Sequence, residues 1–391
     1  MNPSSPITAP VAAGAARGLG ASILAAALAL PGVGVGLAHA ETAPEHGEIS
    51  LKYLDYQDRQ SGLDRTTVHA PSLAVMTPLA GVWSVAGTLT SDDVSGASPR
   101  YHTAISSASH MADRRSAADL GLTRYFQRGS LTVGTAFSTE HDYVSRALSL
   151  QANLESEDKN TTLAFGLGRA NDSINPVSGI VSAERKQTNS FMLGVTQVLT
   201  PRDIVQLSAT YARGNGYFSD PYKLLDNRPR QHNETAVLSR WNHHFTAGDG
   251  TSRVSYRYYS DSYKTRAHTF SGEYLQPLSA GWSVTPSARY HTQNAASFYY
   301  DPVYDSVLGQ PFPPGYVSDP NDYSSADQRL SAFGAVTLGI KVSKQIDPLW
   351  SVNLKLEEYQ QRGTWRLFDQ GSPGLAPLRA QILQIGVNRL W

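Results

Sequence analysis

The feature that most constrains the fold is a two-residue alternation that recurs, in segments of about ten residues, along most of the chain. In one such segment apolar side chains alternate with polar ones (Val205, Leu207, Ala209 and Tyr211 with Gln206, Ser208 and Thr210). Side chains of a β-strand point to opposite faces in turn, so each segment predicts a strand with one apolar face. The 3.6-residue period of a helix is almost absent, and the predicted fold class is all-β.

The composition of the second face of these strands distinguishes between two folds, a soluble sandwich and a membrane barrel. In a sandwich one face packs against another sheet, whereas in a transmembrane barrel the apolar face meets lipid and the other borders a lumen. The second face is polar or small in segment after segment, as in residues 282–290 (Ser283, Thr285, Ser287 and Arg289). This favours an antiparallel transmembrane β-barrel.

The last residues, 381–391, carry the same pattern and end in Trp391. Leu383, Ile385 and Val387 alternate with polar or small residues over the 9–11 residues, roughly, that a membrane-crossing strand needs. Such a strand with a terminal aromatic residue resembles the closing strand of a bacterial outer-membrane barrel. Arg389 departs from that pattern, in which an apolar or aromatic residue is more usual. On this strand alone, the last strand of a soluble sandwich remains an alternative.

The connections between segments fall into two classes that alternate strictly. Short turns rich in Pro, Gly, Asp and Asn are expected at 77–81, 127–129, 155–160, 200–203, 246–250, 277–281 and 344–348. The other class includes the long segments 91–114, 171–187, 214–231, 294–327 and 361–378. Short periplasmic turns and longer extracellular loops are typical of outer-membrane barrels. The count gives about 16 strands, within a range of 14–18, because 68–76, 144–154 and 235–245 are weakly patterned.

Residues 1–40 have the pattern of a cleaved secretory signal peptide. An apolar run over 19–30 is broken by Pro31 and Gly32, and Ala38-His39-Ala40 fits a cleavage site. No later segment reaches the roughly 18 apolar residues of a spanning helix. We therefore expect export through the Sec route, a single barrel domain over 41–391, and a place in the outer membrane of a Gram-negative bacterium.

Composition excludes several classes of function. Lys and Arg together equal Asp and Glu at 33 each, which argues against a nucleic-acid partner. The chain has no Cys, so thiol chemistry and Cys-ligated metals are impossible. No cofactor or metal ion is expected. Asp-rich segments (Asp92-Asp93, and Asp55, Asp58 and Asp64) could bind calcium, but such residues more often hydrogen-bond their own turns.

Five of the six Trp are predicted to form an aromatic girdle at the periplasmic interface. Three of them follow a repeated pattern, a Pro-Leu turn and then a strand that opens with Trp-Ser-Val. The predicted girdle residues are Trp83, Trp241, Trp282, Trp350 and Trp391. Trp residues that merely filled hydrophobic cores would not prefer one end of the strands.

A set of charged residues is predicted to line the pore by strand parity. The candidates are Arg253, Arg257, Glu273, Arg289, Lys355 and Glu357. A row of Arg would bias a water-filled pore toward anions, and facing carboxylates would create a transverse field. Equally, these charges would pair across strands and brace the wall.

One long segment, 297–325, holds seven aromatic residues and five Pro. It would either fold into the barrel mouth and bind a sugar or aromatic solute, or pack as a rigid cap on neighbouring loops. Its position, in the lumen or above it, separates an open channel from a plugged barrel.

No catalytic residues are expected. His243-His244 and the loop residues His102, His110 and His141 fall in no G-x-S-x-G or H-E-x-x-H motif. A barrel-borne hydrolase stays a minor alternative.

Four short motifs resemble an uncharacterised bacterial family, domain of unknown function 3570. They lie at 52–58 (K-Y-L-D-Y-Q-D), 92–99 (D-D-V-S-G-A-S-P), 106–115 (S-S-A-S-H-M-A-D-R-R) and 156–161 (S-E-D-K-N-T). The resemblance covers the mature chain and implies an outer-membrane barrel. That family has no established catalytic residues, so it implies no site residue here. Its members are often encoded near flavin-transfer and small lipoprotein functions, which hints at envelope redox biology.

The sequence therefore predicts a porin-like passive channel for small solutes. The alternative is a plugged barrel that serves as an envelope scaffold for a secretion or extracytoplasmic redox partner. Expected partners are outer-membrane lipids, the barrel-insertion machinery and, for the alternative, a periplasmic protein or lipoprotein.

Overall fold

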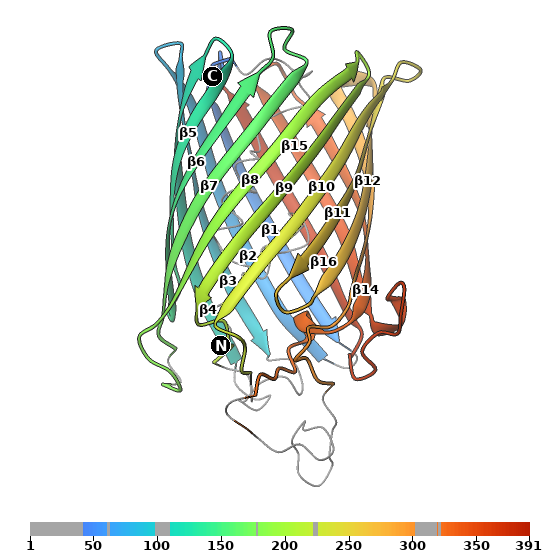
Figure 1. The fold of residues 1–391 in the computed structure, drawn as a ribbon. Coiled ribbons are helices and arrows are strands. Elements are labelled where there is room, and N and C mark those ends of the chain that lie inside the picture. Colours follow the sequence, from blue (N-terminus) through green and yellow to red (C-terminus); the bar gives the residue numbers. More distant parts are fainter. Residues whose placement is uncertain are drawn as a thin grey trace.

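Sixteen strands form the molecule in a computed structural model that describes residues 42–60, 63–97, 110–176, 179–221, 226–301, 319 and 322–391 (Figure 1). The first eight are β1 (Glu48–Gln60), β2 (Leu63–Leu79), β3 (Trp83–Ala97), β4 (His110–Phe126), β5 (Gly129–Thr139), β6 (Tyr143–Glu155), β7 (Thr161–Ile174) and β8 (Glu184–Thr200). The others are β9 (Asp203–Gly216), β10 (Gln231–Phe245), β11 (Gly250–Asp261), β12 (Arg266–Pro277), β13 (Trp282–Gln293), β14 (Phe333–Gln345), β15 (Trp350–Arg362) and β16 (Leu378–Leu390).

Each strand pairs antiparallel with its neighbours in sequence, and β1 pairs with β16 to close the barrel. The closing register runs without interruption from Glu48 opposite Leu390 to Gln60 opposite Leu378. A closed barrel leaves no strand edge unpaired, which is the condition for placing β-structure in hydrocarbon. The predicted fold class and strand number are confirmed. No helix of the described chain is long and apolar enough to cross a membrane.

The two ends of the barrel differ as predicted. At one end, which we call the turn end, short connections join the strands, and the chain terminus at Trp391 lies there too (Figure 1, top). At the opposite end, the loop end, the longer connections gather (Figure 1, bottom). The predicted signal peptide, residues 1–40, lies outside the described residues, as does most of the segment 302–321.

One expectation about the loops is wrong. Asp92 and Asp93 lie within β3 and not in a loop, because β3 continues to Ala97 and β4 begins at His110. Asp92 pairs with Arg115, and Asp93 pairs with Arg114, across the β3–β4 ladder. These ion pairs explain why the ladder continues beyond the apolar part of the strands: each charge meets its complement on the next strand.

The two faces of the wall differ in chemistry. Apolar side chains of the alternating pattern point outward and are exposed, among them Leu89, Leu148, Leu167, Leu338 and Ile385. The inward positions between them carry small or polar residues over most of the wall, as the burial patterns of β6, β7 and β9 illustrate. An apolar outside and a polar inside reverse the usual order of a soluble protein, and they suit a wall with lipid outside.

The inner face departs from this pattern near the loop end. Tyr56, Val68, Ala380 and Ile382 form a buried apolar cluster with Leu54 and Tyr359. Tyr359 also contacts a second cluster, which consists of Phe333, Ala335 and Leu375. Leu375 belongs to the loop between β15 and β16, so this loop packs on the inner apolar residues. The polar or small inner face that the alternating segments predict therefore does not extend over this part of the wall.

Candidate functional site

Four of the six predicted pore residues form ion pairs that face the lumen. Arg253 on β11 lies directly opposite Glu273 on β12, and its Nη1 donates to Glu273 Oε1 at 2.8 Å. Lys355 Nζ lies 2.9 Å from Oε1 of Glu357, two residues further along β15. Residues two apart on a strand share a face, so the second pair runs along the strand and the first runs across it.

Arg257 and Arg289 complete the predicted set. The guanidinium of Arg257 lies over the ring of Tyr259, 5.3 Å from its centroid, on the same face of β11. Arg289 on β13 lies within electrostatic range of Glu357 and Tyr359 on β15. The structure therefore places all six residues on the inner face of neighbouring strands, in the part of the wall made by β11–β15.

Two more cations join this group and were not predicted. Lys341 on β14 lies within electrostatic range of Arg253, Glu273 and Lys355. Arg240 on β10 donates to Gln206 Oε1 at 3.4 Å and is in range of Arg253 and Glu273. Lys341 lies between Ile340 and Val342, so the same alternation would have found it. Arg240 lies beside Trp241 in a strand whose alternation is weak. We call the eight residues the basic wall: six cations (Arg240, Arg253, Arg257, Arg289, Lys341, Lys355) and two carboxylates (Glu273, Glu357).

The wall across the lumen has a different character. Strands β2–β7 present small side chains at the inward positions of their middle parts, among them Ala74, Ala86, Gly121, Gly134, Ala147 and Gly166. Asp119 is the charged residue in this part of the described strands, and Thr88 hydrogen-bonds it. A solute in the lumen would therefore meet side chains with long charged ends on one side and mostly short uncharged ones on the other.

The five Trp predicted for the girdle all lie at the turn end. Trp83, Trp282 and Trp350 are the first residues of β3, β13 and β15, Trp241 lies near the end of β10, and Trp391 follows β16. The sixth, Trp365, lies at the loop end in the short 3-10 turn η4 (Gly363–Trp365). Trp282 and Trp350 are exposed on the outer face.

Three girdle Trp residues each lie directly opposite a cation. The ladder pairs Trp83 with Arg124, Trp282 with Lys344 and Trp350 with Arg389. Each cation lies over the indole ring, with distances to the ring centroid of 4.9, 5.4 and 5.2 Å. Arg389, the residue that departs from the usual closing strand, thus has a partner in this arrangement. Aromatic rings flanked by cations are suited to the depth of lipid head groups.

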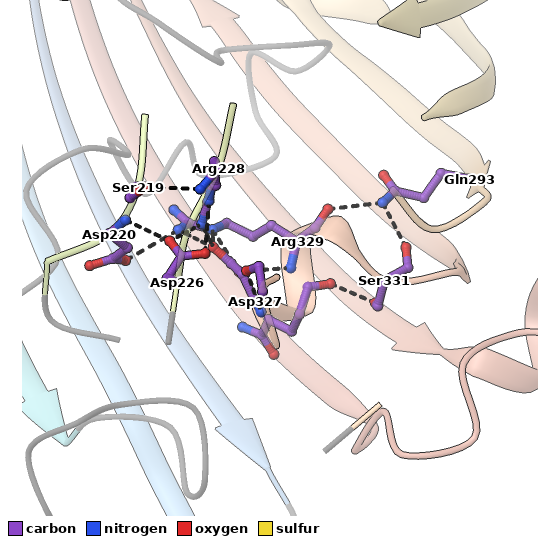
Figure 2. A network of polar contacts seen from close by, with 10 residues as sticks. Ser219, Asp220, Asp226, Arg228, Gln293, Asp327, Arg329 and Ser331 are labelled. Atoms are coloured by element: carbon purple, nitrogen blue, oxygen red, sulfur yellow. Dashed lines mark hydrogen bonds and ion pairs between the residues drawn. The ribbon is translucent and has the colours of Figure 1, made fainter. Parts of the chain in front are cut away.

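A second polar assembly, the loop network, ties two connections together at the loop end (Figure 2). Arg228, from the β9–β10 connection, bonds Asp226 and also Asp327, which lies 99 residues away in the β13–β14 connection. Arg329 bonds Asp327 through Nε at 2.8 Å and reaches Asp220 at 3.4 Å. Backbone bonds between Asn227 and Ser324 join the same two connections.

The loop network is buried, so its charges depend on one another. The carboxyl groups of Asp220, Asp226 and Asp327 are almost completely inaccessible. Burial alone would lower the pKa of Arg228, but the carboxylates of Asp226 and Asp327 outweigh it and raise that pKa above its ordinary value. Burial, followed by the charges of Asp226 and Asp220, also raises the pKa of nearby Tyr217 to about 12. Buried charges of this kind are stable only when every partner is present.

The described ends of the segment 297–325 pack on the same loops. Ser297 N donates to the Tyr263 carbonyl at 2.8 Å, and the rings of Phe298 and Tyr263 meet edge to face. Tyr263 in turn stacks on His232, with centroids 4.0 Å apart. Most of this segment lies outside the described residues. The two positions predicted for it, in the lumen or as a cap on the loops, both concern that part.

The closed antiparallel wall, its apolar exterior and the contrast between its two ends define a β-barrel of the outer-membrane class. Within that class the chain belongs to a family described as "Protein of unknown function (DUF3570)", whose model matches residues 104–379. The family resemblance noted in the sequence is thereby confirmed. No curated protein matches the chain.

Several solved structures resemble the fold at low sequence identity. A bacterial polysaccharide outer membrane secretin matches with 12% identity and a TM-score of 0.49, over 87% of this chain and 98% of its own. OccD3 (OpdP) of Pseudomonas aeruginosa matches with 10% identity and a TM-score of 0.44, over 91% and 94%. The siderophore receptor PirA of the same organism matches with 11% identity and a TM-score of 0.44, over 88% of this chain and 62% of its own. At these scores the likeness says nothing about function.

Proposed function

We propose that the chain is a passive, porin-like channel of the Gram-negative outer membrane that favours small anionic solutes, and that it reaches this membrane through the Sec route. The basic wall is the observation that carries the proposal. The basic wall places six cations and two carboxylates on β10–β15, with Glu234 and Asp261 on the same face nearer the loop end, while the facing wall is mostly small and uncharged. Fixed positive charge beside a path for water lowers the free energy of an anion in that path and raises that of a cation.

The size of this effect sets the experiment. A unit charge about 10 Å from the path is worth roughly 0.4 kcal/mol in water, which corresponds to about twofold in ion occupancy. Salt screens charges over about 10 Å at 0.1 M, so selectivity should be measured at low ionic strength. Neutralising several cations together should then produce a readily measured change.

Planar-bilayer recording of the purified barrel tests the proposal. The wild type should give discrete conductance steps and a reversal potential that favours chloride over potassium. The variant R253Q/R289Q/K341Q should lose most of this preference. The matched control R124Q/K344Q/R389Q removes three cations from the outer face of the wall and should keep it. A folded wild type that never conducts, or a triple variant with unchanged selectivity, would contradict the proposal.

The loop network favours a second candidate, a plugged barrel that acts as an envelope scaffold. Two connections are fastened to each other at the loop end by buried ion pairs, and a fastened cap suits a protein that presents a surface more than one that passes solutes. In that case the partner would be a periplasmic protein or a lipoprotein. Affinity purification from outer membranes should recover it in stoichiometric amount, and the barrel should be silent in bilayers. For neither candidate do we propose catalysis.

A further inference from the structure

A groove runs along the outer wall over strands β1–β5. Its volume is about 470 Å³. The strand register arranges the outward residues here in three rows. The row nearest the turn end is apolar (Leu51, Leu73, Leu89, Ala118, Phe137). The next begins with Tyr53 on β1 and is small on β2–β5 (Pro71, Ser91, Ser116, Thr139), which we call the small row. The row nearest the loop end is polar (Asp55, His69, Asp93, Arg114). The apolar and small rows line the groove.

The small row coincides with a break in the β2–β3 ladder. His69 pairs with Asp93 and Ser72 with Thr90, but the described strands have no pairing between them, where Ala70 and Pro71 face Asp92 and Ser91. The register is the same on both sides of the break, so no residue is inserted. Proline lacks the N–H that a ladder bond needs, which accounts for the gap.

A second proline provides a comparison. The β12–β13 ladder has a gap of the same kind where Tyr274 and Leu275 face Pro286 and Thr285. A proline therefore opens the ladder at both places. At Pro71, however, the neighbouring outward side chains on β3, β4 and β5 are also short, and four residues with inward side chains line the groove as well (Lys52, Ser72, Thr90, Ala117). The groove at β2–β3 thus reaches the plane of the sheet.

The three rows indicate what would fill this groove. Leu51, Leu89 and Phe137 are exposed and belong to the apolar belt of the outer wall. Two residues along a strand span about 7 Å, so the polar row lies only that far beyond the small row. In the polar row His69 Nδ1 lies 2.9 Å from Asp55 and 3.0 Å from the Tyr53 hydroxyl, and Arg114 pairs with Asp93. Both signs of charge and several hydrogen-bonding groups are exposed there.

We propose that the groove holds one hydrocarbon chain of a membrane phospholipid, with the head group of that phospholipid at the polar row. A molecule with an apolar chain and a hydrogen-bonding head matches the order of the rows. The hydrocarbon of the membrane surrounds this part of the wall, so the occupant is already at the surface. The inference does not depend on whether the barrel conducts.

Native mass spectrometry of protein ejected from nanodiscs of phosphatidylethanolamine and phosphatidylglycerol tests this. Wild-type protein should retain one phospholipid molecule. S91W fills the small row with an indole and should lower the retained fraction about tenfold, the equivalent of about 1.4 kcal/mol. The control S239W places the same side chain on the outward face of β10, between Leu207 and Tyr256, and should retain lipid as the wild type does.

A second variant, S116F, also fills the small row and keeps the test valid if S91W fails to fold. Heat-modifiable migration on gels verifies that the barrel of each variant is closed. Equal retention by S91W, S116F and the wild type would overturn the proposal, as would a wild type that retains no lipid. A dimer that dissociates in both filling variants would show that a second copy of the chain occupies the groove, and would overturn it as well.

Discussion

Arg228 is the side chain on which the loop network most depends. Its Nη2 contacts carboxylates from both connections, 2.7 Å from Asp327 and 2.8 Å from Asp226. Arg329 Nη2 also contacts both, Asp327 closely and Asp220 at 3.4 Å. Removing it would leave the buried carboxylate of Asp226 without the guanidinium that bonds it, while Asp327 would keep Arg329. An uncompensated buried charge is far more costly than the loss of a hydrogen bond at the surface.

R228M should therefore weaken the attachment between the two connections without opening the barrel. We expect a local loss of about 3–5 kcal/mol, since one partner of a buried pair is removed. Hydrogen exchange at residues 226–228 and 322–331 should accelerate accordingly. The control R230M removes an exposed pair with Glu184 and should cost at most about 1 kcal/mol. Unchanged protection in R228M would mean that Arg329 and the backbone bonds, and not Arg228, fasten these connections.

Single residues also mark how far prediction from sequence reaches. The parity of β11, β13 and β15 was readable because strong apolar residues (Val254, Val284, Leu354) alternate with the charges, so Arg253, Arg289 and Lys355 were assigned to the inner face. Arg240 was missed because Ser239 and His243 weaken the alternation along β10. The partners of Arg228 were out of reach, because strand periodicity says nothing about loops, and contacts between residues about 100 positions apart have no local signal.

At the scale of whole strands, the pattern predicted the strand number, and most of the connections that it bounded end within a few residues of the observed ones. The clearest error lies at β3 and β4, which extend beyond the predicted loop boundary at residues 91 and 114. Hydrophobic alternation ends where hydrocarbon ends, whereas a ladder can continue into water as long as cross-strand pairs such as Asp92 and Arg115 support it. The sequence pattern thus measures the membrane-embedded part of a strand, and the ladder measures its full length.

The β4–β5 turn is an element where glycine is required. Gly129 has a φ of +148°, and a Cβ there would lie 2.0 Å from the carbonyl oxygen of Asn153 on β6. The positive φ disfavours any residue with a Cβ, and the neighbouring strand leaves no room for a methyl group. The atom in the way belongs to the backbone, so no change of rotamer can relieve the contact.

G129A should lower the free energy of unfolding by about 1–3 kcal/mol, the cost of holding a residue in a conformation that side chains disfavour. The midpoint of urea unfolding in lipid vesicles, followed by heat-modifiable migration on gels, measures it. G272A serves as the control, because Gly272 lies within β12 and a Cβ there would meet nothing within 4 Å. Equal midpoints for the two variants would show that the turn relaxes without cost.

At the scale of the whole molecule, the barrel is asymmetric in two directions, along its axis and across it; we call these the axial and the transverse polarity. Along the axis, the Trp–cation pairs lie at the turn end and the loop network at the loop end. Across it, the basic wall faces small side chains. The axial polarity was predictable because turn length and Trp position both repeat along the sequence. The transverse polarity requires the closed order of strands, since β2–β7 lie across from β10–β15 only after β1 pairs with β16.

The axial polarity leads to a prediction about depth in the membrane. If Trp83, Trp241, Trp282, Trp350 and Trp391 lie at head-group level, a phospholipid brominated near its head group should quench their fluorescence more than one brominated near the end of its chains. The cations opposite three of them favour that depth, because they lie over the rings and are attracted to lipid phosphates. W365F removes the one Trp of the loop end, so that the remaining signal reports the turn end alone. Stronger quenching by the deeper bromine in W365F would place these residues inside the hydrocarbon and would remove the basis for assigning the turn end to the membrane interface.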